Sequence, residues 1–166
     1  MIQKYDNIFS MEETDKIWKY LKTSNWKFWH QSHKDSVNYF WQMNLIEIDF
    51  FKIDLFNKIK KNIGYDFSID KIYANGQTFG LDGNFHIDTI RDEGYTFLYY
   101  PMKNWDLSWG GETVIINPQT EEVNYFYPNP NGGLFFPGNW IHCGKGPSKI
   151  YNDLRISIAY KLIKNV

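Results

Sequence analysis

The sequence predicts a mainly β protein with flanking helices, an α+β fold in which a helical N-terminal third packs against a C-terminal β-sandwich or barrel. Two segments before residue 64 have helical periodicity, whereas the remainder alternates turn pairs with short runs rich in Tyr, Phe, Val and Ile. The length of 166 residues and the hydrophobic share of 43% suit one domain with a substantial core. We expect a single domain over 1–166, with about 1–64 as helical support and about 65–166 as the β core.

The first predicted helix covers about residues 11–22. Ser10 and Glu13 have the spacing of a capping box, and the apolar residues that follow lie on one helical face. The next stretch, NWKFWHQSHKDSVNYFWQMNL, is rich in aromatic residues around a polar KDS break. This pattern favours two short strands joined by a turn at about 32–36.

A second helix is predicted from Asp49 to about Ile63, where the helical period returns and Gly64 supplies a stop. Beyond Gly64, closely spaced turn pairs predict seven or eight strands joined by hairpins. These pairs are Asn75-Gly76, Asp82-Gly83, Gly110-Gly111, Asn117-Pro118, Asn129-Pro130, Gly132-Gly133 and Pro137-Gly138.

Composition excludes several classes of protein. The formal net charge of −1 offers no basic surface for a phosphate backbone, so nucleic acid is disfavoured as a partner. The single cysteine, Cys143, rules out an internal disulfide and suits a reducing compartment. The first residues do not read as a signal peptide, and the longest uncharged stretch is broken by prolines and glycines. We therefore expect a soluble cytoplasmic protein without a membrane segment; the sequence leaves its oligomeric state open.

The segment GNFHID contains His86 and Asp88 two positions apart. If residues 84–88 form a strand, both side chains point to one face and converge. Two histidines and one carboxylate on a single face hold Fe(II) with positions left open, so the pair needs one more histidine. His30 and His33 stand in polar surroundings typical of the surface, whereas His142 stands at a strand end late in the predicted barrel.

The segment DLRISIAYKLI alternates apolar residues with Arg155, Ser157, Ala159 and Lys161. One interpretation is a strand with a solvated face. The other is that the barrel interior holds Arg155 and Ser157, which would bind the carboxylate of an acid through a guanidinium group and a hydroxyl. Periodicity alone does not decide between them.

Taken together, His86-x-Asp88, the distal His142 and Arg155-x-Ser157 resemble the signature of the 2-oxoglutarate and Fe(II)-dependent dioxygenases, in their prolyl 4-hydroxylase-like branch. The resemblance covers about residues 73–162. It is supported by the Asn75-Gly76-Gln77 turn, the run FLYYPMKNW, the Trp109-Gly110-Gly111-Glu112-Thr113 turn and the run Gly133-Leu134-Phe135-Phe136-Pro137. It implies a double-stranded β-helix, a distorted jelly roll, flanked by N-terminal helices.

The resemblance also implies a set of site residues. The iron ligands would be His86, Asp88 and His142, and the residues at the co-substrate would be Arg155, Ser157, Tyr100 and Tyr73. Arg155 would bind the distal carboxylate of 2-oxoglutarate, with O₂ as the oxidant and ascorbate as a further candidate cofactor. A carboxylate at Asp88 favours hydroxylation over halogenation, for which related enzymes have a small residue. Collagen-type relatives use a lysine where this chain has Arg155, and the segment before His86 is longer than in some relatives.

Neighbouring residues have less specific interpretations. Cys143 should point away from His142 and pack in the core. Trp140 shares the face of His142 and either lines the pocket or belongs to the core. The charged turn at 89–93, which includes Arg91, is either a rim or simply solvated.

The implied activity is a hydroxylation that converts 2-oxoglutarate to succinate and CO₂. The substrate would be a peptidyl proline or another protein side chain, with a free amino acid or small metabolite as the alternative. Two other classes stay open: a β-barrel that binds a metal or ligand without turnover, and a zinc hydrolase, because two histidines and a carboxylate also suit catalytic zinc.

Overall fold

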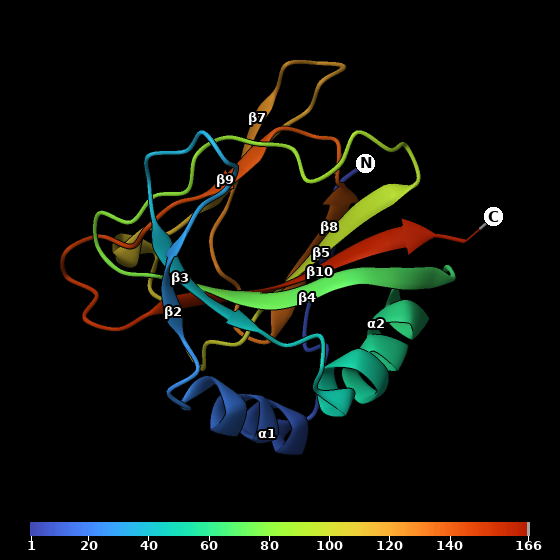
Figure 1. The fold of residues 1–166 in the computed structure, drawn as a ribbon, viewed down its shortest axis with the longest axis horizontal. Coiled ribbons are helices and arrows are strands. Elements are labelled where there is room, and N and C mark those ends of the chain that lie inside the picture. The colour runs from blue at the N-terminus through green and yellow to red at the C-terminus, as the bar shows by residue number, and fades with distance from the viewer. Residues whose placement is uncertain (166) are drawn as a thin grey trace.

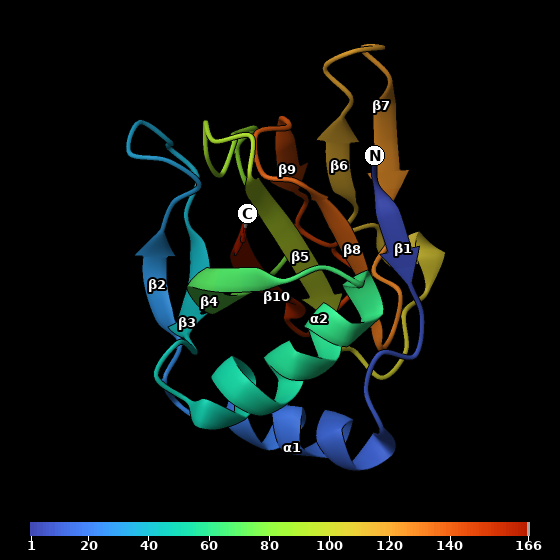
Figure 2. The same cartoon turned by 90° about the vertical axis from the view of Figure 1, so that its right-hand side faces the viewer.

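The computed structural model describes residues 1–165, which form two antiparallel sheets, two α-helices, one π-helix and one 3₁₀-helix, Leu107–Trp109. The larger sheet has the order β1-β8-β5-β10-β4-β3-β2, and the smaller sheet has the order β7-β6-β9. The strands are β1 (Gln3–Tyr5), β2 (Lys27–His30), β3 (Phe40–Asn44), β4 (Phe67–Gln77), β5 (Gly94–Tyr100), β6 (Thr113–Ile116), β7 (Val123–Phe126), β8 (Gly132–Pro137), β9 (His142–Gly144) and β10 (Arg155–Lys164). Figures 1 and 2 show both α-helices below the larger sheet and the smaller sheet above it.

The first helix, α1 (Met11–Leu21), confirms the prediction for this segment. Ser10 accepts a hydrogen bond from the Glu13 backbone N–H, and the Glu13 carboxylate accepts one from the Ser10 backbone, so both halves of the capping box are present. Ile17 and Leu21 are buried on the face that meets the sheet. The sequence therefore fixes both the start of this helix and the face that it buries.

The second helical segment also agrees with the prediction, with one difference. Its first part, Phe50–Leu55, is a π-helix, and α2 (Phe56–Ile63) continues it as an α-helix. Gly64 ends α2 in the left-handed conformation, with φ of 82°, which a residue without Cβ adopts at no steric cost. Apolar periodicity identified the helix but could not distinguish the wider hydrogen-bonding pattern of its first turns.

The N-terminal third is not only helical, which corrects the expectation for about 1–64. β1 pairs with β8, and β3 pairs with both β2 and β4, so three early strands extend the larger sheet at its two edges. The predicted hairpin is present as β2 and β3, and its connection runs over 31–39 rather than 32–36. The seven strands after Gly64 confirm the expected number.

β10 is the central strand of the larger sheet and lies between β4 and β5. Both of its faces are covered from Arg155 to Tyr160, so the solvated-face interpretation of this segment is wrong. Its apolar side chains Ile156, Ile158 and Tyr160 join the core with the helices. The opposite face carries Arg155 and Ser157 into the space between the two sheets.

None of the helices formed by residues 1–165 is both long enough and apolar enough to span a bilayer.

Candidate metal and co-substrate site

His86 and Asp88 lie in the connection between β4 and β5, and His142 begins β9. The expectation of a strand over 84–88 is wrong, since His86 makes only an isolated bridge with His142. Each of these two histidines donates its backbone N–H to the other's carbonyl oxygen, at 3.0 and 2.9 Å. The side chains converge because this bridge and the turn after it bring the pair to His142, and not because of regular strand alternation.

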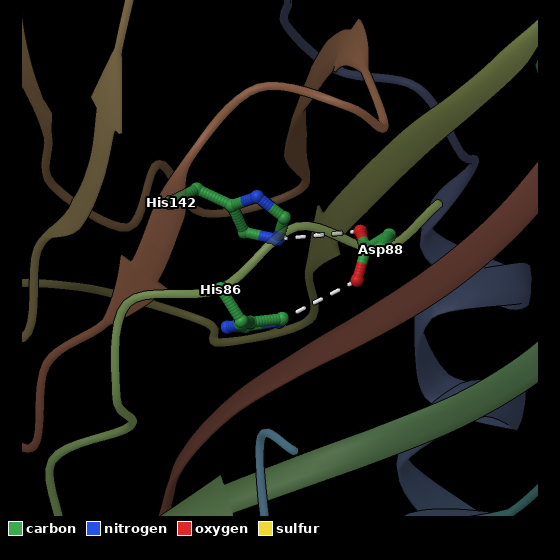
Figure 3. Close-up of side chains that lie close together, drawn as sticks. All are labelled: His86, Asp88 and His142. Carbon is green, nitrogen blue, oxygen red and sulfur yellow. Dashed lines mark ion pairs between the residues drawn. The ribbon is translucent and has the colours of Figure 1, made fainter. Parts of the chain in front are cut away.

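The three side chains form a group that could hold a metal ion, with their ligand atoms all within 4.8 Å of one another. Asp88 Oδ1 lies 3.4 Å from His86 Nε2, and Asp88 Oδ2 lies 3.2 Å from His142 Nε2. Figure 3 shows both imidazole rings turned toward the Asp88 carboxylate. Two nitrogens and one carboxylate on one side leave the other coordination positions free, which is the arrangement of non-haem iron sites.

Backbone carbonyls set the orientation of both rings. His86 Nδ1 lies 2.9 Å from the Asn84 carbonyl oxygen, and His142 Nδ1 lies 2.8 Å from that of Trp140. Because a carbonyl oxygen only accepts, each Nδ1 must carry the proton, and the lone pair of a neutral ring is then on Nε2. Burial lowers the pKa of His142 against the opposing effect of Asp88, so this ring is neutral near pH 7 and ready to bind a metal.

Lys161 and Thr96 contact the Asp88 carboxylate, and neither was predicted as a site residue. The Lys161 ammonium forms an ion pair with Asp88 Oδ2, and the Thr96 hydroxyl donates to the same oxygen at 2.5 Å. Burial alone would raise the pKa of Asp88, but Lys161 and the two histidines outweigh it and hold that pKa well below its usual range. Burial alone would lower the pKa of Lys161, but the attraction of the Asp88 carboxylate outweighs burial and raises that pKa. The sequence pattern that could have identified Lys161 is the alternation of residues 155–161, which places Lys161 on the same strand face as Arg155.

Arg155 is 1% exposed and makes four hydrogen bonds inside the protein. Its guanidinium donates to Gly111 O at 3.0 Å, Gln77 Oε1 at 3.1 Å, Ser157 Oγ at 3.2 Å and Thr113 Oγ1 at 2.9 Å. All of these acceptors are neutral, and none of the ion pairs among residues 1–165 includes Arg155. A buried guanidinium without a carboxylate is costly, which indicates that an anionic ligand completes this site.

The sequence motifs around Arg155 have a structural reason. Gly111, in the Trp109–Thr113 turn, has φ of 74°, and its carbonyl faces Arg155 Nε. A Cβ on Gly111 would lie 2.9 Å from the Trp105 ring and 3.3 Å from Arg155 Cγ. Residues 75–77 were predicted as a turn but form the last part of β4, and Gln77 at its end accepts a hydrogen bond from the guanidinium. The glycine therefore permits a close approach of the turn to the guanidinium.

Two adjoining cavities surround these groups. An inner cavity of about 50 Å³ is lined by Arg155, Ser157 and Thr113 at one end and by both histidines at the other. An open cleft of about 370 Å³ is lined by Asp88, the β2–β3 hairpin and part of β4. Tyr73 and Lys161 line both cavities. A ligand that reached Arg155 would therefore also lie beside the metal-binding group.

The two tyrosines predicted for the co-substrate lie in this region. The Tyr100 hydroxyl is 2.7 Å from Thr113 Oγ1, and the Arg155 guanidinium lies 5.6 Å from the centre of the Tyr100 ring. Tyr73 lines the cavities on β4, opposite Ala159 of β10. Burial raises the pKa of both hydroxyls, so both are protonated donors at neutral pH.

The residues with less specific interpretations lie as follows. Cys143 is buried and does not join the metal-binding group, and Trp140 belongs to the hydrophobic core. His30 contacts Gln42 and lines the outer cleft, whereas His33 is exposed. Charged residues of the 89–93 turn, which are Arg91, Asp92 and Glu93, are exposed.

Neither the models of known protein families nor the curated proteins match this sequence. Several solved structures, however, match the fold of this chain. A prolyl hydroxylase from Trichoplax adhaerens, in complex with a hypoxia-inducible-factor peptide, matches with a TM-score of 0.73 and 17% identity over 98% of this chain and 83% of that one. A 2OG-Fe(II) oxygenase family protein from Burkholderia pseudomallei matches with a TM-score of 0.75 and 13% identity over 98% and 84%. The chain has the fold of the 2-oxoglutarate and Fe(II) oxygenases. The double-stranded β-helix and the helices beside it are thereby confirmed.

This oxygenase fold serves more than one reaction. A non-haem epimerase of nogalamycin biosynthesis that depends on alpha-ketoglutarate matches with a TM-score of 0.69 and 9% identity over 98% of this chain and 77% of that one. The residues of this chain fit an iron and 2-oxoglutarate pair, because a group for the metal and an unpaired buried cation stand at the two ends of one cavity. The fold therefore does not determine the reaction; the residues of the site do.

Proposed function

We propose that this protein is an Fe(II)- and 2-oxoglutarate-dependent oxygenase that hydroxylates a C–H bond. One O₂, one 2-oxoglutarate and one substrate R–H would give R–OH, succinate and CO₂, so that both oxygen atoms and all electrons are accounted for. The observation that carries the proposal is the buried Arg155 guanidinium, which has only neutral partners and lies across a cavity from the His86, Asp88 and His142 group. A site for a structural metal has no use for such a cation.

The metal ligands of this proposal are His86 Nε2, His142 Nε2 and one oxygen of Asp88. Iron, when bound, supplies the activation of O₂. The chain's part is to orient both imidazoles through the Asn84 and Trp140 carbonyls, with Nε2 directed toward the metal, and to leave one side of the group open.

Arg155 binds the distal carboxylate of 2-oxoglutarate in this proposal, through a charge-assisted contact in a site that excludes water. Ser157 Oγ lies 3.2 Å from the guanidinium and is placed to donate its proton to the same carboxylate. The Tyr100 hydroxyl lies 2.7 Å from Thr113 Oγ1, which accepts from the other terminal nitrogen of the guanidinium. Tyr73 lines the opposite end, toward the keto acid. Together these groups orient the co-substrate toward the metal.

For the substrate, the first candidate is a peptidyl proline or another protein side chain. The similarity to the Trichoplax prolyl hydroxylase supports it. The second candidate is a free amino acid or small metabolite. The polar lining of the outer cleft favours it, because many hydrogen-bonding side chains line the cleft, among them His30, Gln42, Asn75 and Lys161.

Succinate release tests the proposed activity. Purified protein with Fe(II), ascorbate and 2-oxoglutarate should form succinate, and candidate peptides and metabolites that are substrates should increase it and gain one oxygen atom by mass spectrometry. His142→Ala and Arg155→Ala should abolish the signal, the first with loss of iron and the second with iron retained. Equal succinate formation by the wild type and His142→Ala would refute the proposal. Zinc retained with hydrolase activity that survives Arg155→Ala would support a hydrolase instead.

A further inference from the structure

Lys161 is a second cation of the site, largely but not fully buried, and the proposed use of Arg155 does not explain it. It follows Arg155, Ser157 and Ala159 on the same face of β10, and its side chain is 12% exposed. Its ammonium contacts Asp88 Oδ2 and lies 3.3 Å from Thr96 Oγ1 and 5.7 Å from the centre of the Tyr73 ring. The site therefore has one cation at each end of this strand face.

The two cations face different spaces. Arg155 lines only the inner cavity, whereas Lys161 lines both that cavity and the outer cleft. A co-substrate whose distal carboxylate is held by Arg155 does not need Lys161 at that end. The ammonium instead stands beside the metal-binding group, on the side that opens into the cleft, where a substrate would present the bond to be oxidised.

The balance of charges in the two cavities indicates that one negative charge is missing near Lys161. The charged residues that line the two spaces are Asp70, Lys71, Asp88, Arg155 and Lys161. Asp70 and Lys71 are exposed and of opposite sign, so the interior holds two cations and the single Asp88 carboxylate. A divalent metal ion and a dianionic co-substrate would cancel each other. One positive charge then stays in the interior, while the Asp88 carboxylate is shared between the metal and Lys161.

An amide in the same space lacks a partner. Asn75 lines both cavities, and its side-chain oxygen is a buried acceptor without a hydrogen bond among residues 1–165. Buried amide oxygens are generally bonded, so a ligand N–H is the natural donor here. A carboxylate for Lys161 and an N–H for Asn75 occur together in amino acids and peptides.

We propose that Lys161 binds a carboxylate of the substrate beside the carbon that is oxidised, so that this protein acts on acids: an amino acid with a free α-carboxylate, or an acidic side chain within a peptide. The inference rests on the proposed function for the place of the reacting carbon. It makes Lys161 the residue that selects acidic over neutral substrates.

Matched acids and amides test this inference without turnover. Protein loaded with Zn(II), which has no redox chemistry, and saturated with 2-oxoglutarate would be titrated by ligand-observed NMR. One arm uses N-acetyl amino acids and their primary amides, which differ only in the α-carboxylate. The other uses the N-acetyl amides of aspartate and glutamate against those of asparagine and glutamine, in which only the side chain carries the charge. The arm with the larger difference in affinity between acid and amide shows whether Lys161 binds an α-carboxylate or a side-chain carboxylate.

The expected result is at least one acid that binds about 30-fold or more tightly than its amide, as for the loss of one member of a buried charge pair. Lys161→Met should reduce that preference to about twofold or less, and Lys161→Arg should retain part of it. Lys164→Met, on the same strand but exposed, is the matched control and should keep the full preference.

Three outcomes would overturn the inference. The first is a panel in which no acid binds better than its amide. The second is a Lys161→Met protein that keeps the preference. The third is a Lys161→Met protein that no longer retains Zn(II), since Lys161 would then act only by positioning Asp88. Failure of the oxygenase proposal is seen separately, as absent succinate release by iron-loaded protein that still prefers acids.

Discussion

Replacing Arg155 by methionine removes one buried charge and keeps an apolar side chain in place of the aliphatic part of the arginine. If Arg155 holds the distal carboxylate of 2-oxoglutarate, the variant leaves that carboxylate buried and unpaired. Truncating one member of a buried charge pair costs about 2–5 kcal/mol, which weakens binding by about 30- to 4000-fold. The low exposure of Arg155, 1%, places the expected effect in this range rather than in the smaller range of surface pairs.

The assay is the shift in melting temperature that 2-oxoglutarate causes in Zn(II)-loaded protein. At about 100 times the wild-type Kd, the ligand stabilises the folded state by about 2.7 kcal/mol, and the melting temperature should rise by about 5–11 °C. The same concentration is at most about three times the Kd of Arg155→Met, so that its shift should be about 3 °C or less. Comparing each protein with and without ligand removes the effect of the substitution on stability itself.

Arg91→Met is the matched control, because Arg91 is exposed in the 89–93 turn and has no contact with the cavities. It should give the full wild-type shift. The reasoning would be refuted if Arg155→Met also gave the full shift, since the guanidinium would then have no part in binding the co-substrate.

Three further outcomes are expected. Asp88→Asn should abolish metal retention, measured by elemental analysis, and should destabilise the metal-free protein by about 3 kcal/mol in urea unfolding, because Lys161 loses its buried counter-ion; unchanged stability would contradict this ion pair. Cys143 is buried, and burial raises the pKa of its thiol to about 11, so iodoacetamide at pH 8 should label it only after unfolding. Because burial lowers the pKa of His142, the unfolded chain takes up a proton first as pH falls below about 6.5; the metal-free protein should lose stability there, with a slope that is smaller in His142→Gln.

Local signals in the sequence were sufficient for most of the fold. The capping box at Ser10, the stop at Gly64 and most of the turn pairs after it act within a few residues, whereas two predicted turn pairs, Asn75-Gly76 and Gly132-Gly133, lie within β4 and β8. The strand β1 was missed because Gln3–Tyr5 is too short for a period to be visible, and its pairing with β8 depends on residues far away in the sequence. Whether such a short edge strand forms depends on its pairing with distant residues, which a local sequence pattern does not show.

His86, Asp88 and His142 converge as the sequence predicted, although the assumed reason was partly wrong. His86 and Asp88 were placed on a regular strand, whereas one backbone bridge and a turn bring them to His142. The importance of Lys161 was not predicted, since a lysine at the end of a strand usually reaches solvent. Only the pairing of β10 between β4 and β5 places it in the interior.

The reciprocal backbone hydrogen bonds between His86 and His142, at 3.0 and 2.9 Å, have a consequence for how an ion enters. Folding of the polypeptide, and not the ion, sets the separation of the two imidazoles, so a vacated centre should keep its shape. Little ordering entropy is lost on loading, and the affinity of such a nitrogen and oxygen site follows the Irving–Williams order, which does not favour Fe(II). The supply of metal ions in the cell would then decide which metal the protein carries. Zinc that occupies the site in place of iron should inhibit the proposed activity.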